Sequence, residues 1–341
     1  MKKVRFGLIG CGSIGRVHAD IIKGLAHAEL VAIAGRGDHH REFAEDLSCD
    51  FCLDYEDLLN NPEIDAVAIC LPSGAHSRAA IQAARAGKHV ICEKPIATTL
   101  EEGQAMIDAA RDKEVELAVI FQHRFDKPIV LLKQAIEEGK LGKLLWGSSK
   151  TIWYRDDKYF SNPWRGTWEH DGGGALINQS IHYIDLLIHL FGDVKSLSGK
   201  CRTLRHKEIE TEDIGVANLE FTSGAIGTIE GTTASYPGLY AELSVFGEKG
   251  SVIIRNDQLL FYHFEGGKWQ EFEKILDPEK ANALNTGPEV DRASHIRQYE
   301  DFINAILEKR RPLVTGEEAI KSLEVIKAIY RASDTKKEVY L

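Results

Sequence analysis

The chain has 341 residues, of which 43% are hydrophobic and 28% charged, and its formal net charge is -10. This length and balance predict a globular protein of two domains with ample core. The acidic balance, with no Lys/Arg block and no run of roughly 20 apolar residues, excludes the usual nucleic-acid-binding and membrane-spanning classes. Six scattered cysteines suit a reducing compartment better than a disulfide scaffold, so we expect a cytoplasmic protein.

The first predicted elements are a strand at 4–9, the glycine-rich turn GCGSIG, a helix over RVHADIIKGL and a second strand at 30–34. In this order G-x-G-x-x-G is typical of a dinucleotide site, because the glycines permit a tight turn, a close pyrophosphate and a closely packed helix. The free N–H groups at the start of the helix favour an anion. We therefore assign the residues of this turn to the cofactor site: Gly10, Gly12, Ser13, Ile14 and Gly15.

The position after the second strand selects between NAD and NADP. An acidic residue there would bind the ribose hydroxyls of NAD, but this chain has Gly35 and Arg36, followed by Gly37 and Asp38. Arg36 suits a 2′-phosphate or stacking on adenine, which favours NADP over NAD. Asp38 remains available for a ribose, so both cofactors stay open.

Three further apolar strands are predicted at 66–71, 89–92 and 116–121. Helices at 41–47, 76–86 and 99–113 separate them. This alternation predicts a doubly wound parallel sheet, in which ligands bind beyond the carboxyl ends of the strands. We assign to the cofactor site these residues that follow strands: Leu71, Pro72, His76, Glu93 and Lys94. Pro95 biases Lys94 toward an extended conformation at the strand end, where its ammonium suits a substrate hydroxyl.

From about residue 123 the pattern changes. After a helix at 128–139, short strands of near-alternating polarity follow at 144–154, 215–221, 225–233, 243–247 and 251–255. They predict an antiparallel sheet with one covered face. The end of the chain reads as helices at 291–308 and 316–332, after a polar loop at 275–293. The predicted domains are therefore 1–122 and 123–341, with the last helices able to pack back on the first domain.

The stretch GGGALINQSIHYIDLLIHL, residues 172–190, predicts a buried helix with two stripes. Apolar residues form one stripe, and a polar stripe of the same spacing contains Asn178, His182, Asp185 and His189. Because buried polar groups without partners are costly, we expect this stripe to face a substrate, water or its own members.

The motifs GLIGCGSIG, ICEKP and GGGALINQSIHYIDLL, with the closing segment from 295 onward, resemble the Gfo/Idh/MocA oxidoreductases over essentially the whole chain. The resemblance implies an N-terminal Rossmann domain and a C-terminal α/β domain with a large, mostly antiparallel sheet. It further implies that NAD or NADP exchanges hydride with a sugar, cyclitol or related polyol. It also implies a homodimer or homotetramer formed through the open sheet.

The family's catalytic lysine corresponds to Lys94 and its catalytic histidine to His182. Many members carry Asp four residues before that histidine, where this chain has Asn178, which cannot act as a base. We therefore expect His182 to exchange the proton of a substrate hydroxyl, with Lys94 stabilising the alkoxide and Asn178 binding substrate. Asp185 and His189 are expected to serve structure or to orient His182.

The combination WRGTW and DGGGALINQSIH resembles a subgroup that includes UDP-N-acetylglucosaminuronate 3-dehydrogenases, which oxidise the ring 3-hydroxyl of a nucleotide sugar. The expected substrate is therefore a sugar or nucleotide sugar. We add Trp164, Arg165 and Arg124 to the expected substrate contacts. Alternatively, Trp164 and Arg165 belong to a loop that is only packed by its tryptophans.

We also considered a metal site and two alternative functions. Cys49 and Cys52 form a C-x-x-C pair without a partner pair, and His182, His189 and Asp185 do not require a metal, so no metal site is predicted. A dinucleotide- and sugar-binding regulator, or a glycoside hydrolase that uses NAD transiently, would share the same fold.

Overall fold

The computed structural model describes residues 2–283 and 292–341. Its contacts divide the chain into two compact units, which we treat separately. The first unit comprises residues 1–122 and 291–320, and the second comprises residues 123–290 and 321–341. Residues 291–320, part of the segment expected to be able to pack back, are thus grouped with the N-terminal residues. Helix α12 (Gly316–Thr335) begins in the first unit and ends in the second.

The first unit contains a six-stranded parallel sheet of order β3-β2-β1-β4-β5-β6. The strands are β1 (Val4–Ile9), β2 (Ala28–Ala34), β3 (Asp50–Cys52), β4 (Ala66–Ile69), β5 (His89–Cys92) and β6 (Leu117–Val119). The order reverses between β1 and β4, which is the topological switch point of a doubly wound fold. The predicted Rossmann sheet is therefore confirmed.

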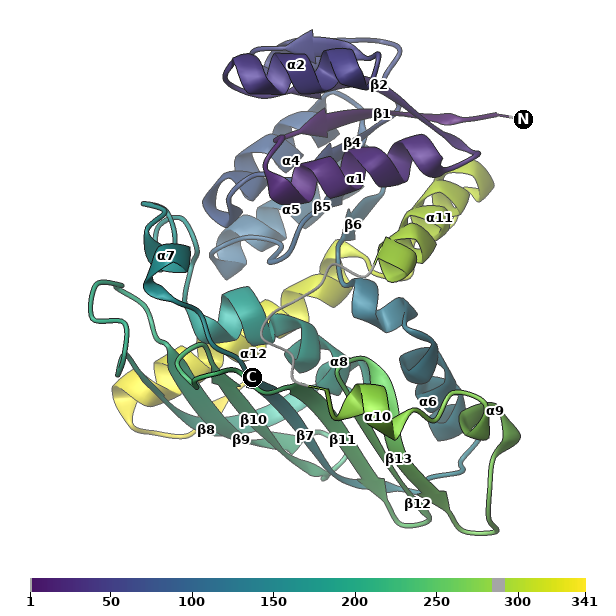
Figure 1. The fold of residues 1–341 in the computed structure, drawn as a ribbon, viewed down its shortest axis with the longest axis vertical. Coiled ribbons are helices and arrows are strands. Elements are labelled where there is room, and N and C mark those ends of the chain that lie inside the picture. Colours follow the sequence, from purple (N-terminus) through teal and green to yellow (C-terminus); the bar gives the residue numbers. More distant parts are fainter. Residues whose placement is uncertain (1, 284–291) are drawn as a thin grey trace. The chain divides into compact units, whose positions relative to one another are not determined.

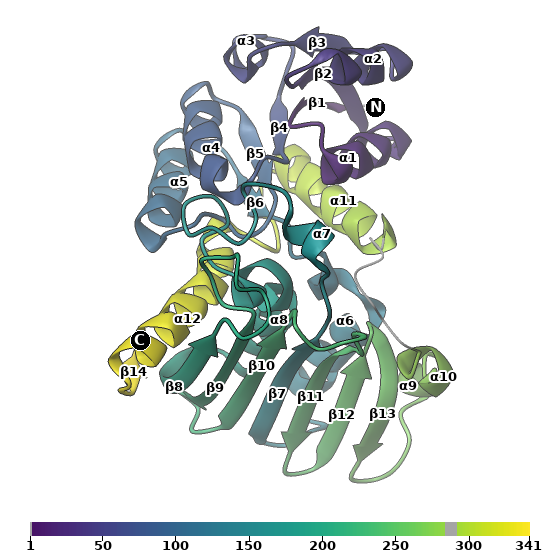
Figure 2. The same cartoon turned by 60° about the vertical axis from the view of Figure 1, so that its left-hand side comes forward.

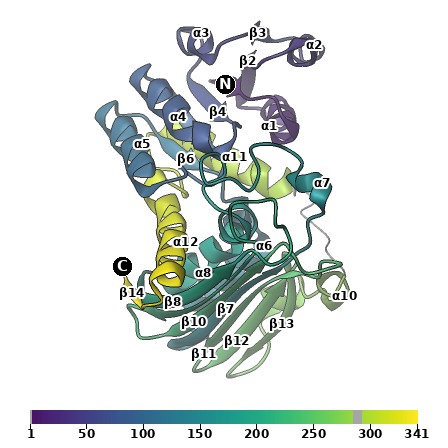
Figure 3. The same ribbon diagram turned by 90° about the vertical axis from the view of Figure 1, so that its left-hand side faces the viewer.

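Helices cover both faces of this sheet, with α4 and α5 on one face and α1 and α11 on the other (Figure 3). The helices of the unit are α1 (Ser13–Gly24), α2 (Asp38–Asp46), α3 (Tyr55–Leu59), α4 (His76–Arg85), α5 (Leu100–Asp112) and α11 (Arg292–Glu308). Helix α11 begins nearly 300 residues after the start of the chain, and its side chains pack against those of β1 in the core. The ring of Phe6 lies 5.9 Å from that of Tyr299 and 6.3 Å from that of Phe302, all three fully buried.

The second unit contains an eight-stranded sheet of order β13-β12-β11-β7-β10-β9-β8-β14 (Figure 2). The strands are β7 (Leu144–Ile152), β8 (Val194–Arg202), β9 (Ile214–Phe221), β10 (Ile226–Thr232), β11 (Ala241–Gly247), β12 (Gly250–Arg255), β13 (Gln258–Phe264) and β14 (Val339–Tyr340). Neighbours are antiparallel except β7 and β10, which run parallel. This confirms the expected mostly antiparallel sheet, although β8, β13 and β14 were not predicted.

One face of this sheet carries helices and the other face carries none of the described helices (Figures 1 and 3). The helices are α6 (Lys127–Glu137), α8 (Ile181–Phe191) and the end of α12, with short turns at α7 (Asp157–Phe160), α9 (Gln270–Glu273) and α10 (Pro278–Ala281). Residues 284–291 of the loop predicted at 275–293 lie outside the described residues, and α10 lies in its described part. None of the described helices combines the length and apolar character needed to cross a bilayer.

Candidate functional site

The residues assigned to the cofactor converge at one edge of the parallel sheet. Ile9, Ile69 and Cys92, the last residues of β1, β4 and β5, are direct partners in the strand register. The segments that follow them, at Gly10, Leu71 and Glu93, therefore leave the sheet side by side. This edge lies at the carboxyl ends of the strands, where ligands of doubly wound folds bind.

The geometry of the glycine turn fits a pyrophosphate. Gly10 has a φ of 98°, and a Cβ on Gly15 would lie 2.1 Å from the carbonyl oxygen of Gly10, so neither position tolerates a side chain. Gly12 is the N-cap of α1 and no side chain caps the helix. A Cβ built on Gly12 would meet no atom within 4 Å, which leaves the uncapped N–H groups of the first turn open to an anion.

Glu93 is held as a buried carboxylate beside Lys94. Its Oε1 lies 3.0 Å from Nε2 of His18, its Oε2 accepts the backbone N–H of Lys94, and Nδ1 of His18 lies 2.6 Å from the hydroxyl of Tyr299. Burial alone would raise the pKa of Glu93, but the hydrogen bond and charge of His18, with Lys94 and His295, lower it to about 2. The charged carboxylate therefore fixes the backbone that carries Lys94, whose peptide bond to Pro95 is cis.

His76 supports this strand end from inside the unit. Its ring nitrogens lie 2.8 Å from the carbonyl oxygens of Pro95 and Leu71, and burial lowers the pKa of the imidazole. Both nitrogens are thus engaged by the protein, so we revise the expected cofactor contact of His76 to a positioning role. Leu71 is half-buried and Pro72 exposed at the same edge.

Arg36 and Asp38 are both exposed after β2, and Asp38 lies in the first turn of α2. The structure therefore offers one cation and one carboxylate for the adenosine end of a dinucleotide.

In the second unit, Gly173 and Gly174 pack against Tyr330 and the buried residue Glu212. The Oε2 of Glu212 accepts the N–H of Gly174, and its Oε1 accepts the N–H of Leu176 and the hydroxyl of Tyr330. A Cβ on Gly174 would lie 1.8 Å from the carbonyl oxygen of Glu212, and one on Gly173 would lie 2.2 Å from the Tyr330 hydroxyl. Gly173 and Gly174 are therefore required for contacts within the protein.

The predicted helix begins as one π-helical segment, η3 (Ala175–Ser180), before α8. A π-helix has more residues per turn than an α-helix, so the direction of Asn178 relative to His182 differs from the predicted stripe. Such segments are frequent at functional sites.

Two polar residues of the expected stripe, Asn178 and Asp185, have hydrogen-bond partners within the protein. Asn178 donates its amide to Oδ1 of Asp171 at 2.8 Å, which brings a carboxylate to the position where the sequence shows only an amide. Asp185 accepts two hydrogen bonds from the guanidinium of Arg124, at 2.7 and 2.8 Å, and both side chains are buried. We therefore revise Arg124 from a substrate contact to an anchor of α8.

His189 is the last residue of the stripe. Burial, with the charges of Arg124 and Lys133, lowers the pKa of His189 to about 3. The imidazole is therefore uncharged near neutral pH.

His182 lies beside a second histidine that is held by carboxylates. The rings of His182 and His123 are edge-to-face with centroids 5.1 Å apart. Nδ1 of His123 lies 2.7 Å from Asp126 and 3.2 Å from Asp257, and the Tyr183 hydroxyl donates to Asp257. Burial alone would lower the pKa of His123, but Asp257 and Asp126 outweigh it and raise the pKa well above its usual range. A cationic imidazole therefore adjoins His182.

A polar cluster surrounds Tyr159 on α7. The guanidinium of Arg165 donates to the Tyr159 hydroxyl and lies over the rings of Tyr159 and Trp164, at 4.1 and 4.4 Å. Tyr159 also donates to Asn178 at 3.3 Å and accepts from Gln179 at 2.9 Å. Trp164, Arg165 and Asn178, predicted separately as substrate contacts, are thus brought together.

Sequence reasoning missed several residues of this half, namely Asp126, His123, Tyr159, Asp171, Glu212 and Asp257. Two of these positions could have been noticed in the sequence. They are the segment QHRFD, directly before the helix predicted at 128, and the acidic residue Asp171, directly before the three glycines. Asp257 and Glu212 reach the site from turns and strand ends far along the chain, so no local pattern marks them.

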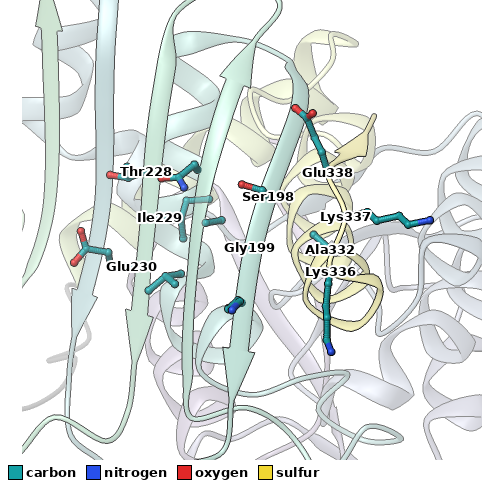
Figure 4. Close-up of a pocket in the computed structure, with 13 residues that line it drawn as sticks. Ser198, Gly199, Thr228, Ile229, Glu230, Ala332, Lys336, Lys337 and Glu338 are labelled. Carbon is teal, nitrogen blue, oxygen red and sulfur yellow. The ribbon is translucent and has the colours of Figure 1, made fainter.

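A hollow of 680 Å³ lies elsewhere, on the sheet face without helices (Figure 4). Ser198, Thr228 and Glu230 line it from neighbouring strands, and Lys336 and Glu338 line it from the end of the chain. It contains none of the predicted site residues.

Comparisons with known proteins agree with this geometry. Residues 4–121 match the model of the NAD-binding Rossmann fold of the Gfo/Idh/MocA oxidoreductase family, and residues 133–341 match its C-terminal alpha/beta domain. The myo-inositol 2-dehydrogenase of Thermotoga maritima is 29% identical, covering 99% of this chain and 98% of that protein.

Solved structures are similar over the full length. The WlbA dehydrogenase of Bordetella pertussis, in complex with NADH and UDP-GlcNAcA, is 33% identical with a TM-score of 0.90, covering 100% of this chain and 98% of that one. A levoglucosan dehydrogenase in complex with NADH is 25% identical with a TM-score of 0.88, covering 99% of each chain. The chain therefore belongs to the Gfo/Idh/MocA family of oxidoreductases, as its motifs predicted.

Proposed function

We propose that this protein is an NAD-dependent dehydrogenase that oxidises a ring hydroxyl of a nucleotide-linked sugar acid, such as UDP-GlcNAcA. The observation that carries the proposal is the surroundings of His182, whose half-buried imidazole adjoins His123, a histidine held by carboxylates. A base flanked by a cation stays neutral more readily, and a neutral imidazole can accept a hydroxyl proton.

The choice of a sugar acid rests on the cationic cluster at Tyr159. Arg165 and Arg155 both lie over aromatic rings of this cluster, and Arg155 also donates to Gln179 at 2.7 Å. Guanidinium groups held in this way suit a carboxylate or phosphate better than an uncharged polyol. The similarity over 100% of the chain to WlbA, solved with UDP-GlcNAcA, supports the same choice.

The residues have distinct chemical roles in this proposal. His182 accepts the proton of the hydroxyl, Lys94 stabilises the oxygen as it becomes negative, and Asn178 donates or accepts a hydrogen bond to the sugar. The nicotinamide accepts the hydride. Asp171 orients Asn178, and Glu93 holds the backbone of Lys94, so neither needs to touch the substrate.

For the cofactor we propose NAD(H), bound through the N–H groups of the first turn of α1. The similar structures that hold NADH support this choice. Asp38 in the first turn of α2 would accept ribose hydroxyls and repel a 2′-phosphate, whereas Arg36 alone would favour NADP. Fluorescence titration should show tighter binding of NADH than of NADPH. Asp38→Ala should reduce the difference between the two dissociation constants. Tighter NADPH would instead make Arg36 a phosphate ligand.

We further propose that a second copy of the chain covers the open sheet face in a dimer or tetramer. Exposed apolar side chains lie along this face, among them Val216, Ile226 and Phe261, with Trp146 stacked on Phe246. Several large apolar side chains exposed on one face favour burial against a partner.

A substrate comparison tests the proposed function. NADH formation would be measured for UDP-GlcNAcA, myo-inositol and levoglucosan with wild type and His182→Ala, with the exposed His170→Ala as matched control. We expect UDP-GlcNAcA to react best, and His182→Ala to lose about 10²–10⁴ in kcat while His170→Ala loses nothing. Cofactor binding without turnover on any substrate would support a regulator, and release of a glycosidic alcohol without net NADH would support a hydrolase.

A further inference from the structure

Outside the proposed active centre, one imidazole and two carboxylates face one another near α7. Nδ1 of His206 lies 3.6 Å from Oδ1 of Asp157 and 3.7 Å from Oε1 of Glu208. Within the described residues, these three side chains place one donor atom each within 4.8 Å of the others. His206 is fully buried, while Asp157 and Glu208 are exposed.

The imidazole of His206 has no hydrogen-bond partner among the described residues, at either ring nitrogen. A buried polar atom without a partner is costly, so native structures rarely leave one in that state. The ring cannot move far, because it packs at 4.5 Å against Phe160 and Asp213 accepts the backbone N–H groups of residues 204–206. The loop thus holds Nδ1 toward the two carboxylates.

The spacing differs from that of a direct ion pair. A charge-assisted hydrogen bond between imidazole and carboxylate is about 2.7–2.9 Å long, as His123 and Asp126 show at 2.7 Å. The ligand atoms of a tetrahedral zinc ion lie about 3.4 Å apart, given zinc–ligand bonds of about 2.0–2.2 Å. The distances of 3.6 and 3.7 Å are therefore too long for a hydrogen bond and within a few tenths of an ångström of a shared cation.

We propose that His206, Asp157 and Glu208 bind a first-row divalent cation such as zinc. The donor set of one nitrogen and two carboxylate oxygens suits such an ion, and the two negative charges balance it. The cation would join α7 to the loop at 203–208. Because Tyr159 on α7 contacts Arg165 and Asn178, the ion would order the proposed substrate-binding cluster without taking part in hydride transfer.

Arg205 provides an internal check of this inference. Its guanidinium lies 3.6 Å from Asp157, so it competes for the same carboxylate. It also donates to the hydroxyl of Tyr154, which offers it an alternative position. Removing the charge of Arg205 should therefore strengthen cation binding. If Asp157 served only as the ion-pair partner of Arg205, the same substitution would not increase the affinity for a cation.

The test is zinc binding by the full-length protein, measured by competition with a chromogenic chelator. We expect about one tight equivalent, at least about tenfold weaker binding in Asp157→Asn and in Glu208→Gln, and tighter binding in Arg205→Gln. His206→Gln should abolish the tight equivalent. Two histidine controls, His263→Gln on β13 and the adjacent pair His39→Gln/His40→Gln, should leave it unchanged.

Cobalt substitution gives a second readout that is independent of activity. Wild type should show the visible bands of a tetrahedral cobalt site, and Asp157→Asn/Glu208→Gln should lose them while keeping its circular dichroism. Both carboxylates are exposed, so this variant should fold even if His206→Gln does not. Zinc affinity and cobalt bands unchanged in the double variant, or no tight zinc equivalent in the wild-type protein, would overturn the proposal.

Discussion

In the proposed mechanism, the residues around His182 would prepare it for acid–base chemistry through their charge. His123, held by Asp126 and Asp257, presents a positive charge 5.1 Å from the ring of His182. A neighbouring cation disfavours a second positive charge, so in the proposed mechanism His123 would favour the neutral form of His182. His123 is in this account a positioning residue, since it contacts Asp126, Asp257 and the ring of His182.

Replacing His123 tests this role through the pH dependence of the reaction. In His123→Gln the midpoint of the rising limb of kcat/KM for alcohol oxidation should move upward by about one pH unit, or about 1.4 kcal/mol. The sign follows because loss of the cation makes protonated His182 easier to form. His123→Arg keeps the charge and should keep the midpoint. An unshifted profile in His123→Gln, with activity merely reduced, would indicate a structural role only.

The residues of the catalytic half could be predicted only in part from the sequence. The motifs predicted Lys94, His182 and Asn178, and the structure shows hydrogen-bond partners for Asn178 and Asp185 of the polar stripe. The partners themselves, such as Asp171 for Asn178 and Asp257 for His123, come from loops whose sequence carries no periodic signal. The two revisions, His76 and Arg124, are residues whose polar groups turn out to be used inside the protein.

At the scale of elements, the strands and helices that alternate clearly were predicted well, while irregular ones were not. The bounds of β1 and β5 agree with the sequence pattern, because each is a continuous apolar run that ends at a turn. Strand β8 is largely polar, and β13 contains the unbroken run LLFYHF, so neither shows the expected alternation. The π-helical start of the α8 region was not predictable, since η3 depends on contacts with Glu212.

The glycine turn before α1 is proposed to hold the pyrophosphate of the cofactor, and substitutions at its glycines test this role. Gly12→Ala should fold normally, because its Cβ meets no protein atom, but should weaken NADH binding by at least about tenfold because the methyl group lies where the pyrophosphate must approach. Gly24→Ala, at the other end of the same helix and equally unobstructed, should leave affinity unchanged. Fluorescence titration and thermal melts measure both. Normal affinity in Gly12→Ala would contradict the proposed phosphate site.

The segment capped by Glu212 makes the second unit sensitive to pH. Burial raises the pKa of Glu212 from 4.5 to about 7. Between these values the unfolded chain has released the proton that the folded chain retains, so this group lowers stability as pH rises through that window, by about 3 kcal/mol in total. Below pH 4.5 both states are protonated and the effect vanishes.

Glu212→Gln should therefore lack this contribution. Urea unfolding at pH 5 and pH 8, followed by tryptophan fluorescence, is a suitable measurement because all five tryptophans lie between residues 146 and 269 of the second unit. The loss of stability from pH 5 to pH 8 should be about 3 kcal/mol smaller in the variant. An equal loss of stability in both proteins would show that the ionisation of Glu212 does not lower the stability of the folded state. Lower stability of the variant at pH 5 is expected as well, because an amide cannot accept all three hydrogen bonds.

At the scale of the whole molecule, the account predicts an assembly through the open sheet. Val216→Lys/Ile226→Lys places two charges on the exposed apolar face and should dissociate the oligomer, as measured by analytical ultracentrifugation. Leu53→Lys, an equally exposed apolar position in the first unit, is the matched control and should leave the mass unchanged. A wild-type monomer, or an oligomer that survives the double substitution, would place the interface elsewhere or exclude it.

The central claim is that this chain moves a hydride from a sugar carbon to NAD. The most direct measurement uses UDP-GlcNAcA carrying deuterium at ring carbon 3, with mass spectrometry of the nicotinamide product. The account predicts one deuterium transferred into NADH for each ketone formed, with a sharp loss of the transfer in His182→Ala. Deuterium that stays on the sugar, or appears only in water, would contradict a hydride transfer at that carbon.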